Sequence, residues 1–153
     1  MGYGIISSEG GKDHCLDYGS IRTSAGGSIA TRLAFVYDKL SELINRYHPE
    51  VAAIEKLFFS KNVKTALLVA EARGVIRVCL EKHGVRCAEF SPADVKIAVC
   101  GHGSAAKNEV QKMVKMLLGL KEIPEPDDAA DALALALALA HTRVTIAPPQ
   151  PLR

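Results

Sequence analysis

A mixed α/β fold around one sheet is predicted by three features of the sequence. A hairpin pattern covers residues 3–22, short apolar strands are expected at 51–54 and 85–90, and helical spacing dominates the remainder. With 153 residues, 48% of them hydrophobic and 24% charged, the chain suits one domain with an aliphatic core. We therefore expect one domain over 1–146 and a disordered, proline-rich tail over 147–153.

The first half of the chain predicts a hairpin, a helix and a strand. Strands are expected at 3–6 and 16–22, joined by a turn at two consecutive glycines. Helical spacing over 29–47 predicts a helix that stops at His48, because a residue before proline disfavours the α conformation. The apolar run 51–54 is typical of a short strand that is buried on both faces of a sheet.

The second half of the chain predicts mostly helices. The expected elements are a helix at 63–83, a strand at 85–90, and helices at 92–100 and 105–118. Gly84 should end the first helix in the left-handed conformation, Ser91-Pro92 should start the second, and Ser104 should cap the third.

The final element has an ambiguous pattern. Alternating Ala and Leu over 132–140 imitate the period of a strand. Ala and Leu are nevertheless strong helix formers, and the preceding Pro-Asp-Asp is a typical helix start. A helix is therefore expected from Asp127 or Asp128 to about His141.

Three acidic residues are candidates for metal-assisted chemistry on a phosphate. Glu55 directly follows the apolar run 51–54, so it is expected at the end of a strand. Asp128 and Asp131 are three residues apart and therefore share one helix face. Such carboxylates can bind Mg²⁺ beside a phosphate, because Mg²⁺ takes few protein oxygens and completes its shell with water and substrate.

Each of these acids also has a purely structural explanation. Asp127 or Asp128 would be the helix N-cap and Asp131 a first-turn carboxylate, both favoured by the helix dipole. Spacing alone favours this explanation. For Glu55, simple exposure beyond the strand and a place at the sheet end facing a cleft are equally good interpretations.

Basic residues are concentrated in the middle of the chain. Residues 56–120 contain 11 Lys or Arg and 5 Asp or Glu, net +6, whereas the segments before and after are each net −2, giving +2 in all. A basic segment between acidic ones suits a protein that binds a polyanion and a metal. The alternative is a solvated basic surface, which charge counting alone favours.

Two further segments are candidates for contact with a phosphate chain. Glycines in 101–107 precede a helix, so backbone N–H groups can approach an anion, with Lys107 one turn in. The alternative there is an ordinary Ser-capped helix. In 56–62, Phe58 and a second phenylalanine lie between lysines and can stack on a base, although one of the two is expected to pack in the core.

Several other kinds of site are disfavoured. The four cysteines form no C-x-x-C pair, so we expect reduced, mainly buried thiols in a cytosolic protein. The five histidines form no H-E-x-x-H motif, and no G-x-x-x-x-G-K loop supports a sugar kinase of related fold. No signal peptide or membrane-spanning run is visible, which favours a cytoplasmic location without membrane attachment.

Five motifs, in order along the chain, resemble the RuvC family of Holliday-junction resolvases. They lie at 54–62, 71–75, 95–96, 103–107 and 128–134, and with their surroundings they cover roughly residues 2–141. The resemblance implies an RNase H-like fold, a homodimer, and Mg²⁺-dependent phosphodiester hydrolysis with two ions per active site. The implied reaction is a pair of symmetric nicks in four-way DNA junctions during recombination and repair. The implied protein partners are RuvA and RuvB.

The resemblance also implies roles for individual residues at the reaction centre. Glu55, Asp128 and Asp131 match three catalytic carboxylates of the family that bind metal. Lys107 matches a basic residue that binds DNA or assists catalysis.

A second set of matched residues is expected to contact DNA. Lys96 matches another basic residue near the active site, and Phe58 matches an aromatic residue that stacks at the opened junction. Lys61, Asn62 and Arg73 lie in the matching motifs and are expected to bind DNA.

One family feature is missing from the sequence. The family begins with a strand that ends in Asp-Pro-Gly, and this Asp is its fourth catalytic carboxylate, whereas the sequence starts after that point. We therefore expect the chain as written to bind metal poorly and to cleave little. A non-catalytic junction-binding module of the same fold is the alternative. A YqgF-like nuclease is disfavoured by the match at Phe58 and 61–62.

Overall fold

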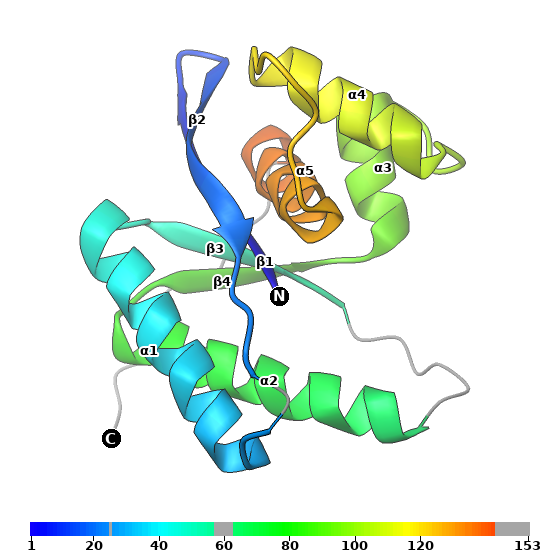
Figure 1. Ribbon diagram of the computed structural model, residues 1–153. Helices are drawn as coiled ribbons and strands as arrows, with labels where there is room; N and C mark the ends of the chain where they lie inside the picture. Colours follow the sequence, from blue (N-terminus) through cyan, green and yellow to red (C-terminus); the bar gives the residue numbers. More distant parts are fainter. Residues whose placement is uncertain (25, 57–62, 143–153) are drawn as a thin grey trace. The chain divides into compact units, whose positions relative to one another are not determined.

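Two antiparallel strands open the chain in a computed structural model that describes residues 1–24, 26–56 and 63–142. β1 (Gly2–Glu9) pairs with β2 (Lys12–Ser20) along its whole length, with one irregularity of register after Ile5 (Figure 1). The turn uses Gly10 and Gly11, whose φ angles of 59° and 80° suit glycine. The predicted hairpin is confirmed, and both strands begin earlier than predicted.

Seven further elements follow the hairpin within the part of the chain that the structure describes. They are α1 (Ile29–Tyr47), β3 (Val51–Glu55), α2 (Val63–Lys82), β4 (Arg86–Phe90), α3 (Pro92–Cys100), α4 (Lys107–Leu117) and α5 (Asp127–His141). Each helix and strand expected from the sequence is present, with ends that differ by a few residues. Within the described residues the strands pair two by two, β1 with β2 and β3 with β4, where one sheet was expected.

The chain divides into two compact units. Of the described residues, the first comprises 1–21, 53–56 and 88–142, and the second comprises 22–24, 26–52 and 63–87. The single domain expected over 1–146 stays a prediction. The tail expected at 147–153 lies outside the described residues.

α5 is at the centre of the first unit. It packs on β1 and β2 and on α3 and α4 (Figure 1). Its buried side chains recur at helical spacing, at Ala129, Ala130, Leu133, Ala134, Leu137 and Ala138. In a strand the alternate leucines would all lie on one face and be equally buried. Here Leu133 and Leu137 are fully buried, whereas Leu135 between them is half-buried. The predicted helix is confirmed.

α1 and α2 pack on each other in the second unit. Ile44 of α1 joins Cys79 and Leu80 of α2 and the following Val85 in a buried cluster. α1 ends at His48, which adopts a left-handed φ of 46° directly before the proline, as the sequence predicts.

The cysteines are free thiols, but the prediction that they are mainly buried is wrong. Only Cys79, between two packed helices, is buried. Cys15 and Cys87 lie on strands of two-stranded sheets and Cys100 is the last residue of α3, so each is only half covered. Among the described helices, none is long and apolar enough to cross a membrane.

Candidate active site

Three acidic residues occupy the N-terminal end of α5. Asp127 and Asp128 are in the first turn, Asp131 lies one turn later, and all three are exposed. The positive end of the helix dipole favours carboxylates at this place. Pro126 is the N-cap residue, and it provides no side-chain hydrogen bond. The structural alternative, in which Asp127 or Asp128 is the N-cap, is therefore wrong.

Two glycines of β1 allow α5 to approach this strand closely. A Cβ atom on Gly2 would lie 1.8 Å from the main-chain oxygen of Asp128, and one on Gly4 would lie 2.8 Å from the main-chain nitrogen of Leu133. Side chains alternate along a strand, so both glycines face the helix. This close contact positions the first turn of α5, which carries Asp128.

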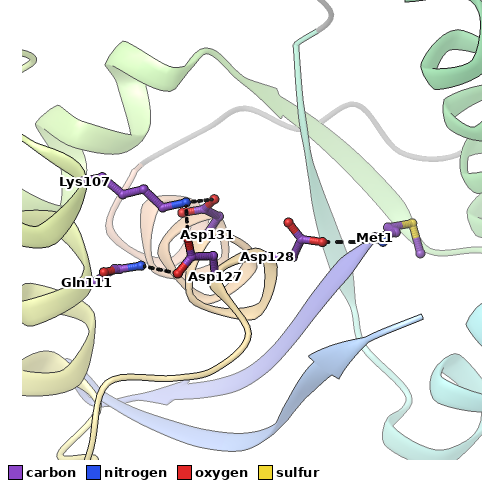
Figure 2. Close-up of polar contacts among 6 residues, drawn as sticks. All are labelled: Met1, Lys107, Gln111, Asp127, Asp128 and Asp131. Atoms are coloured by element: carbon purple, nitrogen blue, oxygen red, sulfur yellow. Dashed lines mark hydrogen bonds and ion pairs between the residues drawn. The ribbon is translucent and has the colours of Figure 1, made fainter. Parts of the chain in front are cut away.

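Lys107 of α4 lies beside two of the acids of α5. Its Nζ donates a hydrogen bond of 2.9 Å to Oδ2 of Asp127 and lies 3.5 Å from Oδ2 of Asp131. Gln111 Nε2 donates a bond of 3.1 Å to Oδ1 of Asp127. Figure 2 shows these four side chains converging from the two helices. We call them the Lys107 cluster.

The two carboxylates offset an unfavourable position of Lys107. Lys107 is the first residue of α4, where the helix dipole disfavours a cation. Its hydrogen bond to Asp127 raises the pKa of Lys107, and the charge of Asp131 raises it further. In turn, Lys107 holds the pKa of Asp127 below its ordinary value, with a smaller effect from Gln111. Lys107 and Asp127 therefore each stabilise the charged form of the other.

The loop before α4 differs from the prediction. Ala106 is the N-cap residue and makes no side-chain cap, so Ser104 does not cap this helix. The Ser104 hydroxyl pairs instead with Nδ1 of His102 at 3.1 Å, and Nε2 of His102 pairs with Glu109 at 3.0 Å. Lys107 consequently stands at the first helical position rather than one turn in.

Asp128 is paired outside the Lys107 cluster. Its Oδ2 lies 3.8 Å from the α-ammonium group of Met1. Figure 2 shows Asp128 pointing toward Met1 while Asp131 points toward Lys107. Each of these two candidate catalytic carboxylates is thus accompanied by a different ammonium group.

Glu55 is the exposed last residue of β3. The next residue anchors this strand end, because the N–H of Lys56 donates a 2.7 Å bond to the carbonyl of Phe90 at the end of β4. Nζ of Lys56 also lies 4.0 Å from Asp94 in α3. The four apolar residues before Glu55 are half-buried rather than buried on both faces, because β3 has a single strand partner within the described residues.

α3 begins at a capping box that lies beside this strand end. The Ser91 hydroxyl accepts from the N–H of Asp94 at 3.1 Å, and the Asp94 carboxylate accepts from the N–H of Ser91 at 2.8 Å. The hydrogen bonds to Ser91 lower the pKa of Asp94. The predicted start, with Pro92 as the first helical residue, is confirmed. This helix carries the half-buried Lys96.

The predicted metal ligands are not gathered into a cluster of three. Over residues 1–24, 26–56 and 63–142, no three His, Cys, Asp or Glu side chains are grouped so that they could hold an ion. Carboxylates are the donor type that Mg²⁺ prefers, so the chemistry of Glu55, Asp128 and Asp131 fits the ion. Their role as ligands stays a prediction.

The remaining predicted DNA contacts are distributed over the chain. Lys96 lies in the first unit with the acids of α5, whereas Arg73 is half-buried on α2 in the second unit. Phe58, Lys61 and Asn62 lie outside the described residues. Their roles in DNA binding stay predictions.

Comparison with known proteins identifies the family. A family model described as crossover junction endodeoxyribonuclease RuvC matches residues 1–141. The chain belongs to the RuvC family. RuvC of Alkaliphilus oremlandii is 48% identical over 142 residues, which are 93% of this chain and 87% of the relative. RuvC of Moorella thermoacetica is 50% identical over 137 residues, which are 90% of this chain and 82% of the relative.

Solved structures of a RuvC protein agree with this assignment. The structure of Thermus thermophilus RuvC covers 92% of this chain and 86% of its own, with a TM-score of 0.85 and 37% identity. The same protein in complex with a Holliday junction substrate gives a TM-score of 0.86 at 36% identity over 90% of this chain and 84% of its own.

These similarities confirm the RuvC family, the RNase H-like fold, and the enzyme class, a nuclease that resolves Holliday junctions. Nucleases of the RuvC family are metal-dependent in general.

Sequence reasoning missed several residues that shape this site. Gln111, Gly2 and Gly4 were not singled out, and Asp127 was considered only as a helix cap. The available signal was spacing, because Lys107 and Gln111 on one helix and Asp127 and Asp131 on the other are each four residues apart. Spacing shows which residues share a helix face, but it does not show which helices meet.

Proposed function

We propose that this chain resolves four-way DNA junctions by paired symmetric nicks, with Glu55, Asp128 and Asp131 as catalytic carboxylates and Lys107 as the cationic partner of Asp131. The observation that carries the proposal is the 3.5 Å separation between Nζ of Lys107 and Oδ2 of Asp131. At this separation the Lys107 ammonium group can attract a phosphate oxygen while the Asp131 carboxylate orients a water molecule beside it. The Thermus thermophilus RuvC complex with a Holliday junction substrate supports a four-way junction as the DNA bound.

The proposed cofactor is Mg²⁺, with two ions per active site held by Glu55, Asp128 and Asp131. When bound, the metal would supply Lewis acidity and lower the pKa of a water molecule. The ammonium group of Lys107 lies 3.5 Å from Oδ2 of Asp131, so a cation bound by Asp131 would compete with it.

Lys107 is proposed to neutralise the charge that develops on the scissile phosphate. A raised pKa keeps its ammonium group protonated at neutral pH. The group is exposed at the start of α4 and so can reach a bound phosphate without a costly desolvation. Because the ammonium group lies beside Asp131, its positive charge is located at the candidate reaction centre.

The remaining binding residues and partners complete the proposal. We propose that Lys96 and Arg73 contact phosphates and that Phe58, Lys61 and Asn62 contact the opened junction. Cleavage of two strands in a symmetric junction requires two equivalent active sites, which a homodimer supplies. RuvA and RuvB are the proposed protein partners, and the cytoplasm is the proposed location.

A second candidate function is junction binding without cleavage. It is favoured by one observation, namely that the described residues contain no group of three ligands ready to hold a metal ion. The same basic side chains would serve binding in either case, because phosphate contacts do not depend on the catalytic carboxylates.

The two candidates are separated by measuring binding and cleavage on the same DNA. A synthetic four-way junction with one labelled strand is incubated with the chain, with and without Mg²⁺, and analysed on native and denaturing gels. Symmetric nicks that require Mg²⁺ and disappear in Asp131→Asn support the enzyme. A retained shift with no nicks at any Mg²⁺ concentration supports the binding module, and a linear duplex is the control DNA.

A further inference from the structure

We propose that Asp127 is a positioning residue, which together with Gln111 holds the ammonium group of Lys107 at the active site. This inference rests on the proposed function, because it gives Asp127 a role through Lys107. Asp127 itself is not expected to bind metal or DNA. The relevant geometry is the Lys107 cluster between α4 and α5.

Asp127 is held from two sides, which distinguishes it from an isolated surface ion pair. Its Oδ2 accepts from Lys107 at 2.9 Å, and its Oδ1 accepts from Gln111 at 3.1 Å. Isolated exposed ion pairs contribute little, but a carboxylate with both oxygens engaged has a defined orientation. The amide of Gln111 therefore fixes the carboxylate that in turn fixes Lys107.

The spacing of these residues makes the arrangement geometrically coherent. Lys107 and Gln111 are four residues apart on α4, and Asp127 and Asp131 are four residues apart on α5. Residues at this separation lie on one face of a helix, one turn apart. Two side chains from each helix therefore meet across the α4–α5 contact.

Lys107 needs such a partner because its side chain is long and exposed. A lysine ammonium on a flexible four-carbon chain has many rotamers, and its first position on α4 is disfavoured by the helix dipole. Asp131 lies 3.5 Å from Nζ, beyond the short range of a strong charge-assisted hydrogen bond. Asp131 is also proposed as a metal ligand, so Asp127 is the carboxylate that remains committed to Lys107.

The proposal predicts a specific pattern of kinetic effects. Asp127→Ala should lower the single-turnover cleavage rate about tenfold, because a misplaced catalytic group loses its productive orientation. The Kd for the junction should be retained or slightly lowered, because a negative charge near the DNA is lost. Asp127→Asn keeps an acceptor oxygen of similar size and should recover part of the rate. Gln111→Ala should have a smaller effect than Asp127→Ala.

A double variant separates positioning from a purely structural role. In a Lys107→Ala background, Asp127→Ala should cause no further loss of rate, since Asp127 acts through Lys107. An equal loss in both backgrounds, or a fall in the urea unfolding midpoint that accounts for the lower rate, overturns the proposal. The matched control is Glu42→Ala, which removes an acid that pairs with Lys39 at 2.7 Å on α1.

A second measurement does not depend on catalysis. The NMR order parameter of the Lys107 ammonium group, assigned by comparison with Lys107→Arg, should fall in Asp127→Ala and stay unchanged in Glu42→Ala. An unchanged order parameter in Asp127→Ala overturns the positioning role even if the chain cleaves junctions. If the unaltered chain does not cleave, the proposed function fails, and the order parameter still decides whether Asp127 orders Lys107.

Discussion

Gly2 lies directly against the main-chain carbonyl of Asp128, so that a Cβ atom on this glycine would stand 1.8 Å from the carbonyl oxygen. No side chain fits there without a movement of β1 or of the first turn of α5. A candidate catalytic carboxylate is therefore positioned by the absence of a side chain on a neighbouring strand.

Substitution of Gly2 by alanine should destabilise the protein and displace Asp128. The added methyl group overpacks the strand–helix contact, which costs about 1–3 kcal/mol. Urea unfolding monitored by circular dichroism measures the loss. Gly74→Ala is the matched control, because a Cβ there would meet no atom within 4 Å beyond its chain neighbours and the backbone of its own helix, and alanine favours the helix of α2. Equal stability of Gly2→Ala and the unaltered chain would contradict the close approach.

Neutralising Asp131 should separate cleavage from binding. Asp131→Asn keeps the size of the side chain but removes the charge proposed to bind metal, so cleavage should fall by about two orders of magnitude or more. Junction affinity should be retained or slightly improved, because a negative charge near the DNA is lost. Single-turnover assays and native gels at one salt concentration measure both effects. Glu42→Ala serves as the control for loss of an acid elsewhere.

The elements of the fold were predictable from the sequence because they depend on local rules. Helical spacing set the bounds of α1 as observed, and Ser91-Pro92 with an acid at 94 marked the start of α3. Strong helix propensity correctly outweighed the strand-like alternation in α5.

The arrangement of the site was less predictable because it depends on contacts between distant segments. Lys107 and Asp127 are 20 residues apart, and only the packing of α4 on α5 brings them together. Ser104 was expected to cap α4, but His102 engages its hydroxyl and the helix begins two residues after the expected first position. Local propensity does not show that the His102 ring competes with the helix start for the Ser104 hydroxyl. It also does not show how many strands pair with β3.

Removing Lys96 should weaken junction binding by the same factor whatever the DNA sequence of the junction. A lysine that contacts one phosphate releases about one counterion, so Lys96→Ala should lower the slope of log Kd against log salt by about 0.9. Fluorescence anisotropy between low and moderate salt measures this slope. Lys39→Ala, which loses an ion-paired lysine on α1, is the control and should leave the slope unchanged. An unaltered slope for Lys96→Ala removes this residue from the DNA contacts.

The capping box at the start of α3 should make a pH-dependent contribution to stability. Hydrogen bonds to Ser91 lower the pKa of Asp94 in the folded state, so the charged carboxylate stabilises the fold. This stabilisation is fully present above the ordinary pKa of an aspartate, about 3.9, and is lost as the pH falls through the lower folded value. Asp94→Ala should therefore be less stable than the unaltered chain at pH 7, and the difference should shrink below about pH 4.

Urea unfolding from pH 7 to pH 3 tests this dependence, with Ser91→Ala as the companion variant. Ser91→Ala should cost about 1 kcal/mol at pH 7, because the N–H of Asp94 loses its acceptor at the helix start. Since Lys56 lies 4.0 Å from Asp94 and follows Glu55 directly, Asp94→Ala should also loosen the strand end that carries Glu55. Amide hydrogen exchange at Lys56, whose N–H bonds to Phe90, reports that loosening. Unchanged exchange at Lys56 in Asp94→Ala would show that the capping box does not support Glu55.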